Sequence, residues 1–91
     1  MDSDRLPGGA LVQQGLEDLA RGLETDASLL VLVGAPRLRR LGIHVPPALH
    51  AAVEHRLYER LARVDPAAAH SRYNALIRML VSFERAAECV G

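Results

Sequence analysis

The side chains that could bind a metal are scattered along this 91-residue chain. Its four histidines are His44, His50, His55 and His70. His50 and His55 are five residues apart, which separates them by about 140° around a helix, so they cannot chelate one ion together. His50 and Glu54 are four apart and could form half of a site, but the sequence offers no second half. We therefore expect no metal site.

The sequence also lacks the arrangements of residues that are typical of enzymes. Its serines lie outside any Gly-x-Ser-x-Gly turn, and its one cysteine, Cys89, has no obvious base beside it. Gly34 and Gly42 stand alone, so no glycine-rich loop could cradle a phosphate. We expect no catalytic residue and no cofactor, and we interpret the chain as a non-enzymatic protein.

A segment in the middle of the chain resembles a helix-turn-helix unit in outline. A short helix at residues 36–41 is followed by a turn at Gly42 and by a longer helix from Pro47. Leu38 stands where such turns usually carry a small residue, and two prolines begin the second helix. The alternative function that this resemblance implies is a small DNA-binding regulator with a degenerate helix-turn-helix at residues 36–60.

The basic side chains of this segment would contact phosphate or DNA. They are Arg37, Arg39, Arg40 and His50. Arginine can contact phosphate with two nitrogens at once, which favours such a site. The same arginines also suit the solvated last turn of a short helix, where positive charge is favourable. The sequence leaves both interpretations open.

Polar and aromatic side chains gather on the last predicted helix. Asparagine and serine are poor helix formers, so Asn74 and Ser82 suggest a constraint other than helix propensity. Tyrosine and arginine are also enriched at protein interfaces. Our hypothesis is a partner-binding strip made of His70, Tyr73, Asn74, Arg78 and Arg85. An ordinary exposed helix face explains the same residues equally well.

The elements that position these residues are predicted to be helices. Leucine, alanine and arginine dominate the chain, and all three are strong helix formers. Val12, Leu16 and Leu19 recur at helical spacing, and Leu23 continues the series. We predict an all-α compact bundle of about four helices, at residues 10–24, 27–33, 47–64 and 66–89, with a short helical turn at 36–41.

The apolar residues 29–33 are the one ambiguous segment. Leu-Leu-Val-Leu-Val could form a buried strand, but a lone strand would leave its backbone groups unpaired unless a second copy supplied a partner. We favour a short buried helix, with Asp26 as its N-cap.

The two longest helices are predicted to form an antiparallel hairpin. Leu49, Val53, Leu57, Leu61 and Val64 would line one inner face, and Leu80 lies in the inner stripe of the other helix, which Glu84 interrupts. Asp65-Pro66 would end the first helix and begin the second with almost no loop, which places the helices side by side.

Composition limits the class of protein. The chain is 49% hydrophobic, and its eleven arginines, with no lysine, balance eleven acids. A zero net charge disfavours non-specific nucleic-acid binding. We expect residues 1–9 to be a flexible polar lead to a single helical domain, 10–91. No signal peptide or membrane span is visible, so a cytoplasmic and, from the arginine-rich composition, bacterial protein is expected.

A chain of this size buries a smaller fraction of its surface on folding than a larger domain does, so pairing with a copy would add stability. We therefore expect a helical protein-interaction module, either a homodimer or a small adaptor or accessory subunit that binds another protein. Its partner would be itself or another protein rather than a membrane, with nucleic acid less favoured.

Overall fold

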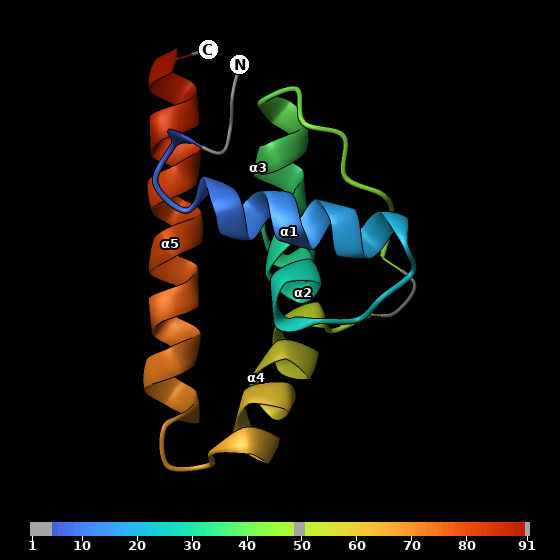
Figure 1. Cartoon of the computed structure of the whole chain (residues 1–91), viewed down its shortest axis with the longest axis vertical. Helices are drawn as coiled ribbons and strands as arrows, with labels where there is room; N and C mark the ends of the chain where they lie inside the picture. The colour runs from blue at the N-terminus through green and yellow to red at the C-terminus, as the bar shows by residue number, and fades with distance from the viewer. Residues whose placement is uncertain (1–4, 49–50, 91) are drawn as a thin grey trace.

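The structure is a computed structural model that describes residues 5–48 and 51–90, and these residues form α-helices and no strand (Figure 1). The helices are α1 (Gly9–Ala20), α2 (Asp26–Val33), α3 (Ala35–Arg40), α4 (Val53–Val64) and α5 (Ala69–Val90). α2 and α3 lie end to end beside the long α5, and α1 crosses in front of them. The predicted all-α bundle is confirmed. None of the described helices is both long and apolar enough to cross a membrane.

α2 is the central helix of the bundle. The ambiguous segment at residues 29–33 lies within it and is helical. Leu30 and Val31 are completely enclosed, because α2 packs against α1, α3, α4 and α5. A helix that is surrounded on all sides needs no polar face, which explains why its apolar residues are consecutive. The other large, fully buried side chains of the core are Val12, Leu38, Leu57 and Phe83.

α1 approaches α2 very closely at one glycine. A Cβ atom on Gly15 would lie 2.3 Å from the carbonyl oxygen of Ala27 and 2.5 Å from Cγ2 of Val31. Only a residue without a side chain allows the two backbones to meet at this distance. The predicted stripe of α1 is correct at Val12, which is buried, and at Leu16 and Leu19, which are partly buried against the core. Gly15 is a buried residue of the same helix that the stripe did not include.

α1 ends at Ala20, earlier than the predicted boundary at residue 24. Gly22 adopts a left-handed conformation with φ 71°, and the backbone N–H of Leu23 donates to the carbonyl oxygen of Asp18 at 2.8 Å. These bonds close the last turn of the helix. Leu23, predicted to continue the inner stripe, is consequently outside the helix and 48% exposed.

α4 and α5 form the predicted antiparallel hairpin. Oδ1 of Asp65 accepts the backbone N–H groups of Ala67 and Ala68 at 3.2 and 3.3 Å, so Asp65 closes the turn at residues 66–68. α5 begins after this turn, at Ala69, so the predicted helix start at residue 66 was three residues too early. The two helices diverge away from this turn, and α4 packs more closely on α2 than on α5.

α4 begins at Val53, later than the start of the predicted helix at residues 47–64. The guanidinium group of Arg39 donates to the carbonyl oxygens of residues 45–46 at 2.9–3.2 Å, which holds this part of the chain extended. Ala52 then adopts a left-handed conformation with φ 58°, so the helix cannot extend back through it.

Two members of the predicted inner face of this helix differ from expectation. Val64 is at the end of α4 and 74% exposed, because the chain turns away towards α5 directly after it. Leu49 lies outside the described residues. Leu57 and Leu61 are buried, as the pattern predicts.

The structure describes residues 5–9 of the predicted polar lead. The backbone N–H of Gly9 donates to the carbonyl oxygen of Leu6 at 2.8 Å. Leu6 is partly buried against the core, so this side chain contributes to the packing of the bundle.

Candidate functional site

The outward face of α5 brings together most of the predicted partner-binding strip. Asn74, Arg78 and Arg85 are exposed on the same side of the helix. His70 is also exposed, and its Nε2 lies 3.2 Å from Nδ2 of Asn74. No hydrogen bond or ion pair of Arg78 or Arg85 is found within the described part of the chain, so both guanidinium groups face solvent unpaired.

Tyr73 does not belong to this face. Its ring packs against that of Tyr58 of α4, with 5.9 Å between the ring centroids, and the residue is half-buried in the hairpin. Loss of water around its hydroxyl, together with the nearby charge of Glu54, raises the pKa of Tyr73. The predicted strip is therefore divided: four of its members share the outward face, and Tyr73 supports the contact between α4 and α5.

Two of the three arginines of α3 bind other groups of the same molecule. Arg37 binds Glu88 of α5 with 2.7 Å between Nη2 and Oε1, and its Nη1 lies 3.8 Å from the buried Glu84. Arg39 binds backbone carbonyls, as described above. Arg40 is exposed. Of the residues predicted to contact phosphate, Arg37 and Arg39 already bind other groups of the protein, and only Arg40 is exposed without such a contact among the described residues. The fourth, His50, lies outside the described residues.

The outline of a helix-turn-helix at residues 36–60 is not reproduced in the fold. α3 ends at Arg40 and α4 begins at Val53, so twelve residues separate them, whereas a helix-turn-helix has a turn of about three or four residues. Gly42 does form the predicted turn after α3, in a left-handed conformation with φ 89°. The glycine turn was predicted correctly, but the helix expected directly after it is an extended segment.

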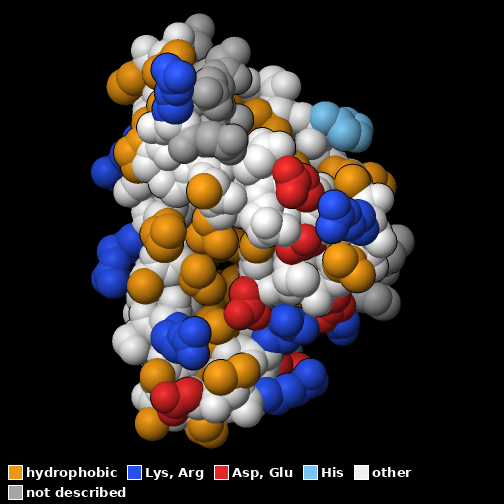
Figure 2. Space-filling model, in the orientation of Figure 1, with side chains coloured by type: hydrophobic (Ala, Val, Ile, Leu, Met, Phe, Trp, Pro, Cys, Tyr) orange, Lys and Arg blue, Asp and Glu red, His pale blue; other side chains and the backbone are white. Residues whose placement is uncertain are grey.

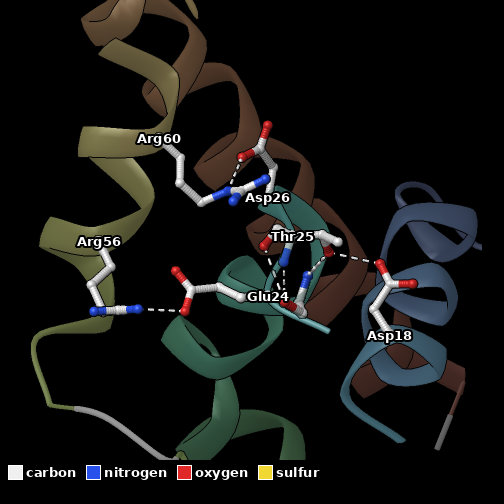
Figure 3. A network of polar contacts seen from close by, with 7 residues as sticks. Asp18, Glu24, Thr25, Asp26, Arg56 and Arg60 are labelled. Carbon is white, nitrogen blue, oxygen red and sulfur yellow. Dashed lines mark hydrogen bonds and ion pairs between the residues drawn. The ribbon is translucent and has the colours of Figure 1, made fainter. Parts of the chain in front are cut away.

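A polar network at the corner between α1 and α2 was not anticipated from the sequence (Figure 3). Asp18 is buried, and its carboxylate accepts hydrogen bonds from the hydroxyl of Thr25 at 2.7 Å and from the side chain of Gln14 at 2.9 Å. The hydrogen bond from Thr25, then that from Gln14, lowers the pKa of Asp18, against a smaller opposing effect of burial. This carboxylate is therefore stabilised in its charged form.

The same corner caps α2. The backbone N–H of Ser28 donates to the hydroxyl oxygen of Thr25 at 3.0 Å, and the backbone N–H of Thr25 donates to the hydroxyl oxygen of Ser28 at 2.8 Å. Thr25 is therefore the N-cap, and the prediction of Asp26 was wrong by one residue. The reciprocal Thr-x-x-Ser pair resembles a capping box with serine in the third position, a signal that the sequence does contain.

Two ion pairs join this corner to α4 (Figure 3). Arg60 donates to Asp26 at 3.0 Å, and Arg56 binds Glu24. Nε of Arg56 is buried and has no hydrogen-bond acceptor among the described residues. Next to this arginine, a mainly apolar cleft of about 370 Å³ opens between the end of α1, α2, the segment at Pro46–Pro47 and the start of α4.

The described residues contain no group of three or more histidine, cysteine, aspartate or glutamate side chains that could hold a metal ion. His55 pairs with Glu59 on the same helix, with 2.7 Å between Nε2 and Oε1. Cys89 is exposed near the end of α5. The two features that could serve a ligand or partner are thus the outward face of α5 and the apolar cleft.

Comparison of the chain with protein-family models, with curated proteins and with solved structures finds no match.

Proposed function

We propose that this chain is a non-enzymatic helical module that binds an acidic surface of another protein through the outward face of α5. The observation that carries the proposal is the charge of this face. Residues 66–83 contain no acidic side chain, and the arginines in and directly after this stretch point to solvent. Figure 2 shows basic side chains spaced along the α5 side of the molecule, whereas most acidic ones in that view lie over the other helices.

The pairing of the other arginines supports this interpretation. Arg37, Arg56 and Arg60 each bind a carboxylate on a different element of the fold. By contrast, Arg72, Arg78 and Arg85 form no ion pair within the described residues. Arg21, Arg40 and Arg63 also form no ion pair there, but they lie on or next to three different helices, whereas these three lie on one helix. Unpaired arginine is well suited to bidentate contacts with the carboxylates of a partner.

The same charge argues against self-association through this face. In a symmetric dimer the same patch lies on both subunits, so this arginine-bearing face would lie against the same face of the second subunit. Like charges placed opposite one another weaken an interface. Between the expected homodimer and the expected adaptor, the outward face of α5 favours the adaptor.

The test is charge reversal on α5 with a matched control. Arg78→Glu/Arg85→Glu should weaken capture of a partner from the native host by about tenfold or more, because attraction becomes repulsion. Arg21→Glu/Arg63→Glu changes the net charge equally at exposed positions of α1's end and α4, and should leave capture unchanged. Equal capture by both double variants would contradict the proposal.

DNA binding is the other function that this experiment addresses. A protein that neutralises DNA phosphates loses affinity steeply as salt rises. Retardation of duplex DNA at low salt that is abolished by Arg78→Glu/Arg85→Glu would assign the α5 face to nucleic acid instead. The separation of α3 from α4 lends no support to a helix-turn-helix version of this function.

A further inference from the structure

α5 lies at one edge of the molecule, and the other helices pack on its inner side (Figure 1). Its 22 residues extend for about 33 Å. The side chains buried on the inner side include Leu80, Phe83 and Ala87. Exposed side chains occur from His70 to Val90, so the outward side is accessible to a partner along the whole helix.

Arg78 and Arg85 form a row on this outward side. They are seven residues apart, which in a helix gives a rise of about 10.5 Å and a rotation of only about 20°. Both are exposed, and neither forms an ion pair within the described residues. The row therefore presents two positive charges, about two turns apart, to the same side of α5.

A strip of short or apolar side chains lies beside this row. Its members recur at spacings of four, three and four, the repeat by which one helix packs along another, and they are Ala75, Met79, Ser82 and Ala86. All are at least partly exposed, and Met79 is 45% exposed. Arg78 and Arg85 border the strip, at the positions from which packed helices form ion pairs with each other.

The spacing of the two arginines selects the conformation of a partner segment that lies along α5. In another helix, residues seven apart also lie about 10.5 Å apart on one face, so two carboxylates at this spacing meet both arginines. In an extended strand the same distance is about three residues, and side chains three residues apart point to opposite faces. A strand would therefore offer a carboxylate to only one of the two arginines.

On the basis of the proposed function, we infer that the acidic partner contacts α5 with an α-helix that carries carboxylates seven residues apart. This helix lies along α5, and its carboxylates bind Arg78 and Arg85. Its own small or apolar side chains cover the strip that contains Met79. The partner is thus narrower in chemistry than an acidic surface in general, because it needs both a helical backbone and this spacing of charge.

The experiment compares two synthetic peptides of equal composition, each of about 18 residues so that a helix can form. Two glutamates are seven residues apart in the first peptide and four apart in the second, where they span only about 6 Å of the same face. Each peptide is titrated into the intact chain, and the Nε–H signals of the arginines are followed by NMR. The first peptide should bind about threefold more tightly, because it can form both exposed ion pairs at once. The signals of Arg78 and Arg85 should shift at the same peptide concentration.

The matched variant exchanges two residues of α5. Asn74→Arg/Arg85→Asn keeps the composition and leaves two arginines four residues apart, at positions 74 and 78. Both exchanged positions are exposed, so the fold should persist, and the dispersion of the amide signals checks it. This variant should prefer the second peptide by a similar factor. Arg85→Gln, which leaves one arginine in the row, should show no preference, and it decides the point if the exchange variant folds poorly.

Equal affinity of the unmodified chain for the two peptides would overturn the inference, and so would a preference that a folded exchange variant does not reverse. Shifts confined to residues outside α5, or binding of neither peptide, would also overturn it. The proposed function is decided separately, by capture of the native partner. Capture that is lost in Arg78→Glu/Arg85→Glu, without any preference between the peptides, would mean that the partner's acidic surface has another shape.

Discussion

The corner between α1 and α2 and the hairpin of α4 and α5 join neighbouring helices in different ways. At the corner, Gly15 lets the backbones meet, and Asp18 and Thr25 close the loop with hydrogen bonds. In the hairpin the helices diverge, and Tyr58 and Tyr73 make the ring contact between them. The regular apolar spacing of the hairpin therefore reflects how its helices pack on the rest of the core. The close contact between α1 and α2, by contrast, depends on a single glycine.

Each region also contains one buried carboxylate, and the two differ in their surroundings. Asp18 accepts two hydrogen bonds at less than 3 Å, which lower its pKa. Glu84 of α5 has an arginine nitrogen at 3.8 Å, and burial raises the pKa of Glu84 despite the opposing charge of Arg37. The two shifts are opposite in direction because hydrogen bonds are the largest influence on the pKa of Asp18, whereas burial is the largest influence on the pKa of Glu84.

The largest effect is expected from the face that α4 presents to α2. Leu57 is completely buried, so Leu57→Ala should lower the free energy of unfolding by about 2–5 kcal/mol through lost burial and the cavity left behind. Leu80→Ala, on α5, should fall in the same range. Urea unfolding followed by circular dichroism measures both. Val64→Ala, at a 74% exposed position, is the control, and an equal loss there would contradict the assignment of the core.

A smaller but still substantial effect is expected at the α1–α2 corner. Gly15→Ala should cost about 2–3 kcal/mol, because the new Cβ would overlap the carbonyl oxygen of Ala27 and force the helices apart. In the double variant Gly15→Ala/Val31→Ala stability should not recover, since the backbone oxygen remains in place. Glu17→Ala, on the exposed side of α1, should change stability little. If Gly15→Ala were neutral, the close approach would be refuted.

These two regions also show what could be predicted from sequence. Helix type and order, the hairpin, and the chain turns at Gly42 and at Asp65-Pro66 follow from local signals: apolar spacing, glycine after a helix and aspartate before proline. The close contact of α1 with α2 at Gly15 does not follow from such signals. From sequence alone, a glycine within a helix indicates only a lower helix propensity, and its role becomes clear once the opposing backbone is known. The burial of Asp18 could not be predicted either, because its partner Thr25 lies beyond the turn that follows the helix.

The candidate sites were predictable to different degrees. Exposed arginines on one side of a helix can be identified from helical spacing, so Arg78 and Arg85 were found. The apolar cleft was not, because its walls come from segments that are distant in the chain and its position depends on the extended course of residues 43–48. That course is held by hydrogen bonds from Arg39, for which the sequence left a phosphate contact and a solvated helix end both open.

The two carboxylates are expected to give pH profiles of opposite sign. A lowered pKa in the folded state means that the unfolded chain binds the proton more tightly. Asp18 therefore stabilises the fold above about pH 4, its ordinary pKa, and this contribution is lost as pH falls through its lower folded value. Glu84, with a raised pKa, favours the fold while protonated, so its contribution decreases as pH rises from about 4.5 through its folded value.

Asp18→Asn and Glu84→Gln test this contrast through urea unfolding between about pH 2 and 7. Asp18→Asn should remove part of the rise in stability between the acid limb and about pH 4. Glu84→Gln should remove part of the decline above about pH 4.5, while Arg37 keeps its contact with Glu88. Slopes that change in the same direction in both variants would contradict the difference in surroundings.

The smallest effect is expected from the ring contact within the hairpin. The rings of Tyr58 and Tyr73 are tilted by 57°, and Tyr58 is 37% exposed, so this contact is open to water on one side. A double-mutant cycle with Tyr58→Ala and Tyr73→Ala should give a coupling of about 0.5–1.5 kcal/mol, the range for an aromatic pair. The coupling isolates the ring contact from the burial that each tyrosine loses separately. A value well above this range would mean that the direct contact between α4 and α5 stabilises the hairpin as much as its packing on α2 does. The difference between the hairpin and the α1–α2 corner would then be refuted.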